Sequence, residues 1–200
     1  MDPHPDGRDI KKPGGRPGEK VRNELYKYTI MTPKQFAEKY WPEAKKAEAQ
    51  TGVPALVTLA QAAVESGWGG VAPGNMFFGV KDTDGVNGNE QLLTTTEYHN
   101  SMNVRYPVVI SITPVLIGGK KRYKYRVKDY FRKYKTPADS FADHGQFLRK
   151  NQRYARAFQT KDPYKFINAI AAAGYATDPN YAGTLTKVAN MIKKYVPAAG

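Results

Sequence analysis

The stretch Pro54–Gly67, PALVTLAQAAVESG, contains a single ionisable side chain, Glu65, in an otherwise uncharged run. Proline is favoured at the start of a helix and glycine at its end, so a helix is predicted over Pro54–Ser66. The apolar residues recur at the spacing of one helix face: Leu56, Leu59, Ala60, Ala63 and Val64. The helix is therefore expected to be largely core, with Glu65 in its last turn.

Two effects are expected to raise the pKa of the Glu65 carboxyl. Apolar neighbours disfavour the charged form, and the partial negative charge at a helix C-terminus acts in the same direction. A carboxylic acid that stays protonated near neutral pH can serve as a general acid. The alternative is a surface glutamate that happens to end a helix, which would be preferred for an isolated residue.

Further helices are predicted on both sides of this segment. One begins at Thr32-Pro33, a capping residue followed by proline, and Pro42 is expected to break or restart it. Three more follow later in the chain: from Thr136-Pro137 through Leu148, over about Tyr164 to Ala173, and from Asp178-Pro179, with Asp178 as the cap, to about Tyr195.

A β-lobe is predicted over about residues 91–134. Three segments there are rich in β-branched or aromatic residues: Leu92–Tyr98, Val104–Ile117 and Tyr123–Tyr130. Gly118-Gly119 is typical of a tight hairpin turn. Helices, then strands, then helices indicate an α+β domain with the sheet inserted between helical parts.

The composition suits one soluble domain with a tail. The chain has 200 residues, of which 40% are hydrophobic and 24% charged, and it contains no cysteine. Disulfides and thiolate metal sites are thereby excluded, and three scattered histidines do not suggest a metal, so no cofactor is expected. Residues 1–24, with four prolines and four glycines, are expected to form a flexible tail or linker before a domain over 25–200.

The net charge of +13 is concentrated in one stretch, because Lys120–Lys135 holds nine Lys and Arg against Asp129. A basic, tyrosine-rich segment suits a polyanion, either nucleic acid or an anionic cell-wall polymer. An alternative is a solvated strand face that carries lysine to prevent aggregation at a sheet edge. No zinc-finger or RRM pattern supports nucleic-acid binding, so no nucleic-acid partner is expected.

The residues around Glu65, QAAVESGWG (61–69), and the following NMFFGVK (75–81) resemble the catalytic-helix signature of glycoside hydrolase family 73. These are bacterial peptidoglycan N-acetylglucosaminidases, including autolysins and the hydrolase domain of the flagellar rod-cap protein. Further matches occur in family order: TTEY (95–98), DYFRKY (129–134), DSFADH (139–144) and AGYATDPNYA (173–182). The resemblance covers about Thr32 to Tyr195.

The resemblance implies a lysozyme-like fold, in which a helical lobe and a smaller β-lobe flank a glycan groove. It also implies that Glu65 is the general acid for a β-1,4 bond between N-acetylglucosamine and N-acetylmuramic acid. Glu97 takes the position of the family's second carboxylate and could activate water. Alternatively, the sugar's 2-acetamido group attacks the anomeric carbon, with Tyr175 or Tyr181 as its orienting partner.

Four more residues are expected at the substrate: Tyr181, Trp68, Asn75 and Phe78. Trp68 is also a candidate support for Glu65, and Asn75 a candidate to fix the loop. His144, beside Asp143, is expected to be structural.

The chain departs from the family pattern by an insertion over Asn100–Lys128, which suggests an enlarged β-lobe with an extra hairpin. The expected partner is peptidoglycan, and no membrane partner is expected. A protein partner could bind the inserted hairpin or the tail, and the chain is expected to be a monomer. The enzyme is expected to act in the periplasm or outside the cell. Because no signal peptide is visible in the sequence, export by a phage or secretion-system route is expected. Two alternatives remain: a non-catalytic wall-binding module, and muramidase or lytic transglycosylase specificity on the same fold.

Overall fold

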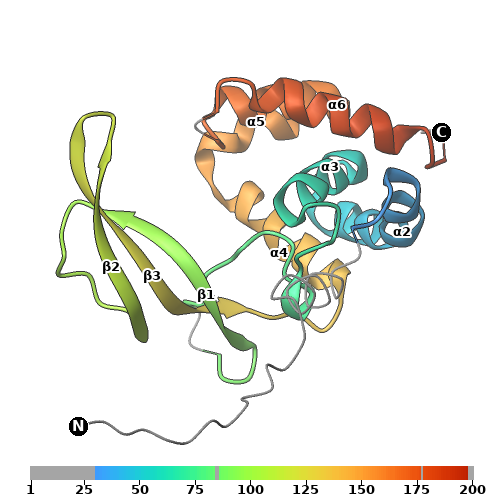
Figure 1. Ribbon diagram of the computed structural model, residues 1–200. Coiled ribbons are helices and arrows are strands. Elements are labelled where there is room, and N and C mark those ends of the chain that lie inside the picture. The colour runs from blue at the N-terminus through green and yellow to red at the C-terminus, as the bar shows by residue number, and fades with distance from the viewer. Residues whose placement is uncertain (1–29, 84–85, 177, 198–200) are drawn as a thin grey trace, which may run out of the picture.

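The computed structural model describes residues 30–83, 86–176 and 178–197, which form a helical lobe and an antiparallel sheet (Figure 1). The helices and strands are α2 (Pro33–Thr51), α3 (Ala55–Ser66), β1 (Glu90–His99), β2 (Val108–Ile117), β3 (Lys120–Arg132), α4 (Pro137–Lys150), α5 (Pro163–Ala172) and α6 (Tyr181–Lys193), with short 3-10 helices η1 (Pro73–Asn75) and η2 (Gln152–Gln159). The α+β architecture with an inserted sheet is confirmed. The expected tail, residues 1–24, lies outside the described residues.

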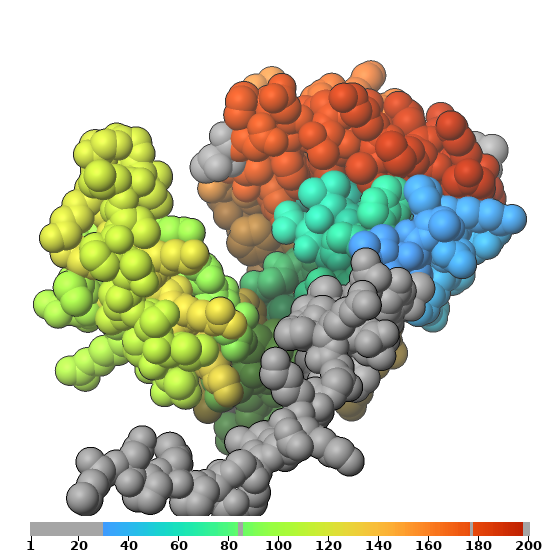
Figure 2. Space-filling view, in the orientation of Figure 1, coloured from blue at the N-terminus to red at the C-terminus, as the bar shows by residue number. Residues whose placement is uncertain are grey.

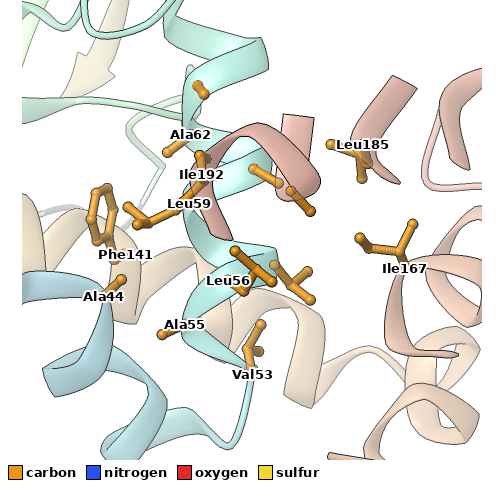
Figure 3. Close-up of a cluster of buried hydrophobic side chains, with 14 of the residues drawn as sticks. Ala44, Val53, Ala55, Leu56, Leu59, Ala62, Phe141, Ile167, Leu185 and Ile192 are labelled. Atoms are coloured by element: carbon orange, nitrogen blue, oxygen red, sulfur yellow. The ribbon is translucent and has the colours of Figure 1, made fainter. Parts of the chain in front are cut away.

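Helix α3 is at the centre of the helical lobe and packs against α2, α4, α5 and α6. Figure 3 shows Leu59 close to Phe141 of α4 and Ile192 of α6, and all three side chains are fully buried. Burying each such side chain contributes about 1.5–3 kcal/mol. The predicted ends of α3 are confirmed, because Pro54 precedes its first turn and Gly67 ends it in a left-handed conformation (φ 57°). The position of Glu65 is therefore fixed by the core.

Helix α2 runs through Pro42 without a break, so the expected interruption is wrong. The ring lies on the exposed face, and the stripe that faces the core continues on both sides of it: Phe36, Tyr40, Ala44 and Ala47. Proline removes one backbone hydrogen bond and strains the preceding turn. Packing of this continuous stripe offsets that local cost.

The sheet has the strand order β1-β3-β2, with both pairs antiparallel. Gly118 and Gly119 form the predicted two-residue turn between β2 and β3, both with positive φ (56° and 73°), as such a hairpin requires. Strand β2 starts at Val108 rather than at the expected Val104. Because β3 pairs on both sides, β3 is the central strand and the apolar β2 is an edge.

The later helices begin largely as predicted. Thr136 caps α4, with its side chain accepting the Asp139 backbone N–H. Asp178 is not the cap of α6, which is Asn180; instead its carboxylate accepts the Asn180 backbone N–H at 2.8 Å. Helix α6 therefore begins two residues later than expected, and Asp178 stabilises the turn that precedes it. None of the helices in the described part of the chain is both long and apolar enough to cross a membrane.

Figure 2 shows how the two lobes lie in space: they meet near the end of β3 and separate toward the β2–β3 turn. The strand β3 leads directly into α4, so the sheet and the helical lobe are joined by a few residues.

Candidate active site

Glu65 lies at the last turn of α3, where the helix passes from the core to the surface. Gln61, Ala62 and Ala63 are fully buried, whereas Glu65 is exposed. Immediately after it the chain reverses, because Gly67 and Trp68 both have left-handed backbones (φ 57° and 58°). The carboxyl is thereby presented at the end of a rigid, buried helix.

The Glu65 side chain opens into a cavity of about 650 Å³. Its lining comes from α3, the loop after it, the end of β3, α4, η2 and the segment before α6: Glu65, Phe78, Val80, Lys81, Thr83, Arg132, Asp143, His144, Gln146, Phe147, Lys150, Tyr154 and Tyr175. The volume and the mixture of aromatic and polar side chains suit a small polar ligand such as a sugar. Of the residues expected at the site, the cavity brings together Glu65, Tyr175 and Phe78.

The two acids of the cavity lining differ in their partners. Asp143 accepts two hydrogen bonds from Arg132 Nη1, at 3.0 and 2.9 Å, and a third from the Tyr134 hydroxyl at 2.7 Å. Glu65 forms no ion pair with any described residue, and partial burial of its carboxyl, within a side chain that is otherwise exposed, raises the pKa. Glu65 is thus the acid of this cavity that favours holding a proton.

Tyr175 and His144 form a hydrogen-bonded pair beside Glu65. The Tyr175 hydroxyl lies 2.8 Å from His144 Nε2, and the imidazole stacks on Phe78 with ring centroids 3.8 Å apart. Burial lowers the pKa of His144 to about 3, so the ring is neutral at physiological pH. Burial, and the nearby Tyr181 and Glu65, raise the pKa of Tyr175, which therefore keeps its proton.

Tyr181 lies behind Tyr175 rather than in the cavity lining. The two rings stack with centroids 5.4 Å apart, and the Tyr181 hydroxyl accepts a hydrogen bond from buried Gln61 Nε2 at 3.0 Å. Gln61 is one helical turn before Glu65. The Tyr181 ring therefore connects the start of α6 to the helix that carries the acid.

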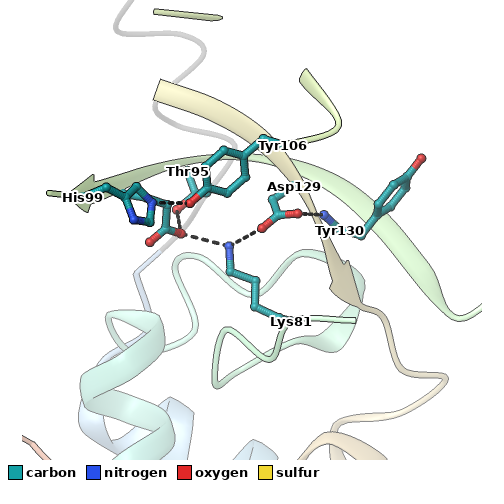
Figure 4. A network of polar contacts seen from close by, with 7 residues as sticks. Lys81, Thr95, His99, Tyr106, Asp129 and Tyr130 are labelled. Carbon is teal, nitrogen blue, oxygen red and sulfur yellow. Dashed lines mark hydrogen bonds and ion pairs between the residues drawn. The ribbon is translucent and has the colours of Figure 1, made fainter. Parts of the chain in front are cut away.

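Glu97 lies on β1 and is outside the cavity lining. Lys81 reaches from the loop after α3 to the sheet and donates to Glu97 Oε1 at 2.9 Å and to Asp129 Oδ2 at 2.7 Å (Figure 4). Burial lowers the pKa of Lys81, but its hydrogen bonds to Asp129 and Glu97 raise it by more, so the net shift is upward. Lys81 itself lines the cavity. Glu97 thus contacts the cavity through this lysine.

Trp68 and Asn75 lie outside the cavity lining. Trp68 packs edge-on against Phe36 of α2, with ring centroids 5.6 Å apart. Asn75 has a left-handed backbone (φ 57°), and its Nδ2 donates to the carbonyl oxygens of Tyr134 and Lys135 at 3.0 and 3.1 Å. The amide joins the loop after α3 to the segment between β3 and α4.

Comparison with known families identifies the chain. The profile of the family named Glucosaminidase, described as mannosyl-glycoprotein endo-beta-N-acetylglucosaminidase, matches residues 41–195. The chain belongs to the glucosaminidase family. The matched residues include the whole cavity lining and all three strands.

Two relatives of this glucosaminidase-family chain are each named peptidoglycan hydrolase FlgJ. The protein from Vibrio parahaemolyticus is 31% identical over 193 residues, covering 93% of this chain and 56% of the relative. The protein from Salmonella typhimurium is 35% identical over 167 residues, covering 80% and 46%. The chain thus spans about half the length of the curated relatives it matches.

Solved structures show the same fold. The C-terminally truncated glycoside hydrolase domain of Salmonella typhimurium FlgJ aligns with a TM-score of 0.61 at 33% identity, covering 82% of this chain and 99% of that one. A peptidoglycan hydrolase from Sphingomonas sp. A1 aligns with a TM-score of 0.54 at 26% identity, covering 84% and 97%. The expected membership of a glycoside hydrolase family is confirmed.

Sequence reasoning missed several residues that line the cavity of this glucosaminidase domain. Four of them recur at i, i+3, i+4 and i+7 along α4: Asp143, Gln146, Phe147 and Lys150. That spacing marks a helix face next to the buried one, which could have been found from the sequence. The hydrogen bonds from Lys81 to Glu97 and Asp129 could not be predicted from neighbouring residues, because both acids are distant from Lys81 in the chain.

Proposed function

We propose that this chain hydrolyses the glycan of peptidoglycan at the β-1,4 bond between N-acetylglucosamine and N-acetylmuramic acid, with Glu65 as the general acid. The observation that carries the proposal is the placement of Glu65: an acid with a raised pKa and no ion-pair partner among the described residues, at the end of a buried helix and in a sugar-sized cavity. The names of the FlgJ relatives support the substrate.

In the proposed reaction, protonated Glu65 gives its proton to the glycosidic oxygen as the bond from that oxygen to the anomeric carbon breaks. Glu97 takes a proton from the water that attacks the anomeric carbon, so the product gains one hydroxyl. Glu97 contacts the cavity only through Lys81 in this structure. The proposal therefore requires bound glycan to draw the sheet toward α3.

Tyr175 is assigned to the 2-acetamido group of the sugar. Because His144 is neutral, it can donate its Nε2 proton to the Tyr175 oxygen, which leaves the phenolic proton free for the sugar carbonyl. Phe78, stacked against His144 in the lining, offers an apolar surface to a sugar ring. Tyr181, Trp68 and Asn75 are assigned supporting roles, which maintain the helix end and loop around these groups. The site of action proposed is the cell-wall compartment.

The test is digestion of purified peptidoglycan, followed by borohydride reduction and mass spectrometry of the soluble fragments. Reduced N-acetylglucosamine at the fragment ends supports the proposal, with the Glu65→Gln variant as the inactive control. Reduced muramic acid would assign the chain to muramidases. The absence of soluble product would favour a non-catalytic wall-binding module.

A further inference from the structure

The cations of β3 lie on one face of the sheet. Five basic residues, here called the basic face, occupy alternate positions of this strand: Lys120, Arg122, Lys124, Arg126 and Lys128. Side chains at alternate positions of a strand point to the same side, about 7 Å apart. The intervening positions carry Lys121 as their single cation, and its ammonium lies 5.5 Å from the ring centre of Tyr123.

The basic face is exposed and is not neutralised by neighbouring side chains. Lys124, Arg126 and Lys128 are exposed, and none of the five cations forms an ion pair with a described residue. Their cross-strand partners between Lys120 and Lys128 contain no acid and include five hydroxyls: Thr94, Thr96, Tyr98, Ser111 and Thr113. Like charges at this spacing repel one another and destabilise the sheet. The hydroxyls are available as hydrogen-bond donors.

Protection of a sheet edge does not account for this arrangement. Strand β3 lies between β1 and β2, so its cations do not border a free edge. The edge strand β2, VVISITPVLI, has no charged residue at all. Charges that prevent edge-to-edge pairing belong on the edge strand itself. The expected edge-protecting role is therefore wrong, while the expected exposure of this strand face to solvent is confirmed.

None of the five cations of the basic face lines the cavity, although Arg132 at the end of β3 does. Glu97 and Asp129 occupy the other face of the sheet, where Lys81 of the cavity lining binds both. The sheet therefore has acids on its cavity side and free cations on its outer side. A polyanion on the outer side would leave the cavity open to a separate glycan strand.

We propose that the basic face binds the carboxylates of the stem peptides on a neighbouring strand of peptidoglycan, and so holds the enzyme on the wall while the cavity acts on another strand. This inference rests on the proposed function. Repeated carboxylates match a row of cations flanked by hydroxyl donors. Because the pairs form at an exposed surface, the binding is weak at each contact, additive along the row and sensitive to salt.

The test uses the full chain with Glu65→Gln, so that the wall stays intact, and measures sedimentation with insoluble peptidoglycan. Replacing Lys124, Arg126 and Lys128 by glutamine is expected to weaken binding about tenfold at low salt. The matched control replaces Lys165, Lys187 and Lys194, three exposed lysines of the helical lobe, by glutamine and should bind like the parent. The charge-preserving variant Lys124→Arg with Lys128→Arg should also keep binding, which separates charge from folding.

The ligand side is tested with peptidoglycan whose free carboxyls have been converted to amides. The parent should bind this amidated wall as weakly as the triple glutamine variant binds the native wall. Equal binding by the triple variant and the control, or equal binding to amidated and native walls, would overturn the inference. So would tighter binding to double-stranded DNA than to wall at about 150 mM salt. Fragment release by the parent with native Glu65 reports separately on the proposed function.

Discussion

The imidazole of His144 lies flat against the ring of Phe78, with 11° between the two planes, while its Nε2 meets the hydroxyl of Tyr175. One residue of α4 thus joins the loop after the acid-bearing helix to the segment before α6. Stacking fixes the ring plane, and the ring plane fixes the direction of the hydrogen bond to Tyr175. The cavity wall beside Glu65 is consequently built from three rings in mutual contact, those of Phe78, His144 and Tyr175.

Glu65→Gln is expected to lower the rate of fragment release by about a hundred- to ten-thousand-fold, because the amide has no proton to donate. The free energy of unfolding at neutral pH should stay equal or rise, since burial disfavours the charged carboxylate that the variant removes. Activity assays and thermal unfolding check both. A variant that releases fragments at the parent rate would exclude Glu65 as the acid.

The activity of the parent is expected to fall on the alkaline side as Glu65 loses its proton. Because the pKa of Glu65 is raised, this loss should occur at a higher pH than for an ordinary glutamate. A pH profile of kcat/KM on soluble muropeptides tests this. A rate that rises continuously through neutral pH would contradict the assignment.

Tyr175→Phe is expected to lower kcat about ten- to a hundred-fold and to cost about 1–3 kcal/mol of stability, because buried His144 Nε2 loses its partner while the ring stack with Tyr181 is kept. Tyr181→Phe is the comparison variant. It leaves Gln61 Nε2 buried without its acceptor, so it should cost about 1–3 kcal/mol of stability and affect kcat less. Kinetics and urea unfolding on both variants distinguish a substrate contact from a packing role.

Acid is expected to destabilise the fold through His144. The pKa of this ring is about 3 in the folded chain against 6.5 as the ordinary value, so between these limits the unfolded chain binds more protons. The free energy of unfolding therefore decreases as pH falls from about 6.5 toward 3, by at most about 1.4 kcal/mol per pH unit. His144→Phe should flatten this slope in urea unfolding at several pH values, whereas His99→Phe should keep it. Equal slopes in all three proteins would refute the assignment.

Lys81→Met is expected to lower kcat about tenfold, because Glu97 loses the ammonium that holds it near the cavity and is left beside Asp129. Lys121→Met is the control, since that lysine is on the same face of the sheet without an acidic partner. Azide provides a second measurement: it should restore turnover to a Glu97→Ala variant if Glu97 activates water. Failure of azide to do so would favour attack by the sugar's own acetamido group.

Features set by neighbouring residues were predictable from the sequence. The caps at Thr32 and Thr136, the ends of α3 and the Gly118-Gly119 turn each depend on a few adjacent side chains, and all are confirmed. The placement of Glu65 at the end of a buried helix follows from the same local pattern. The 3-10 helix η2 was not predicted, although Tyr154, Ala157 and Phe158 recur at the spacing of one helix face.

Features set by distant contacts were not predictable. Pro42 is tolerated because α2 packs along its whole length, and the strand order is decided by pairings that no local signal contains. The same holds for the site. His144 acquires its contact with Tyr175 across 31 positions, and Lys81 reaches Asp129 across 48.

The register of the sheet makes β2 separable from the contacts that reach the cavity. His99 at the end of β1 is directly opposite Tyr123 of β3, so a chain that turned straight from one to the other would keep Glu97, Asp129 and their bonds to Lys81. Strand β2 pairs only with the far side of β3. Shortening or removing β2 is therefore expected to leave the β1–β3 ribbon and its two bonds to Lys81 in place.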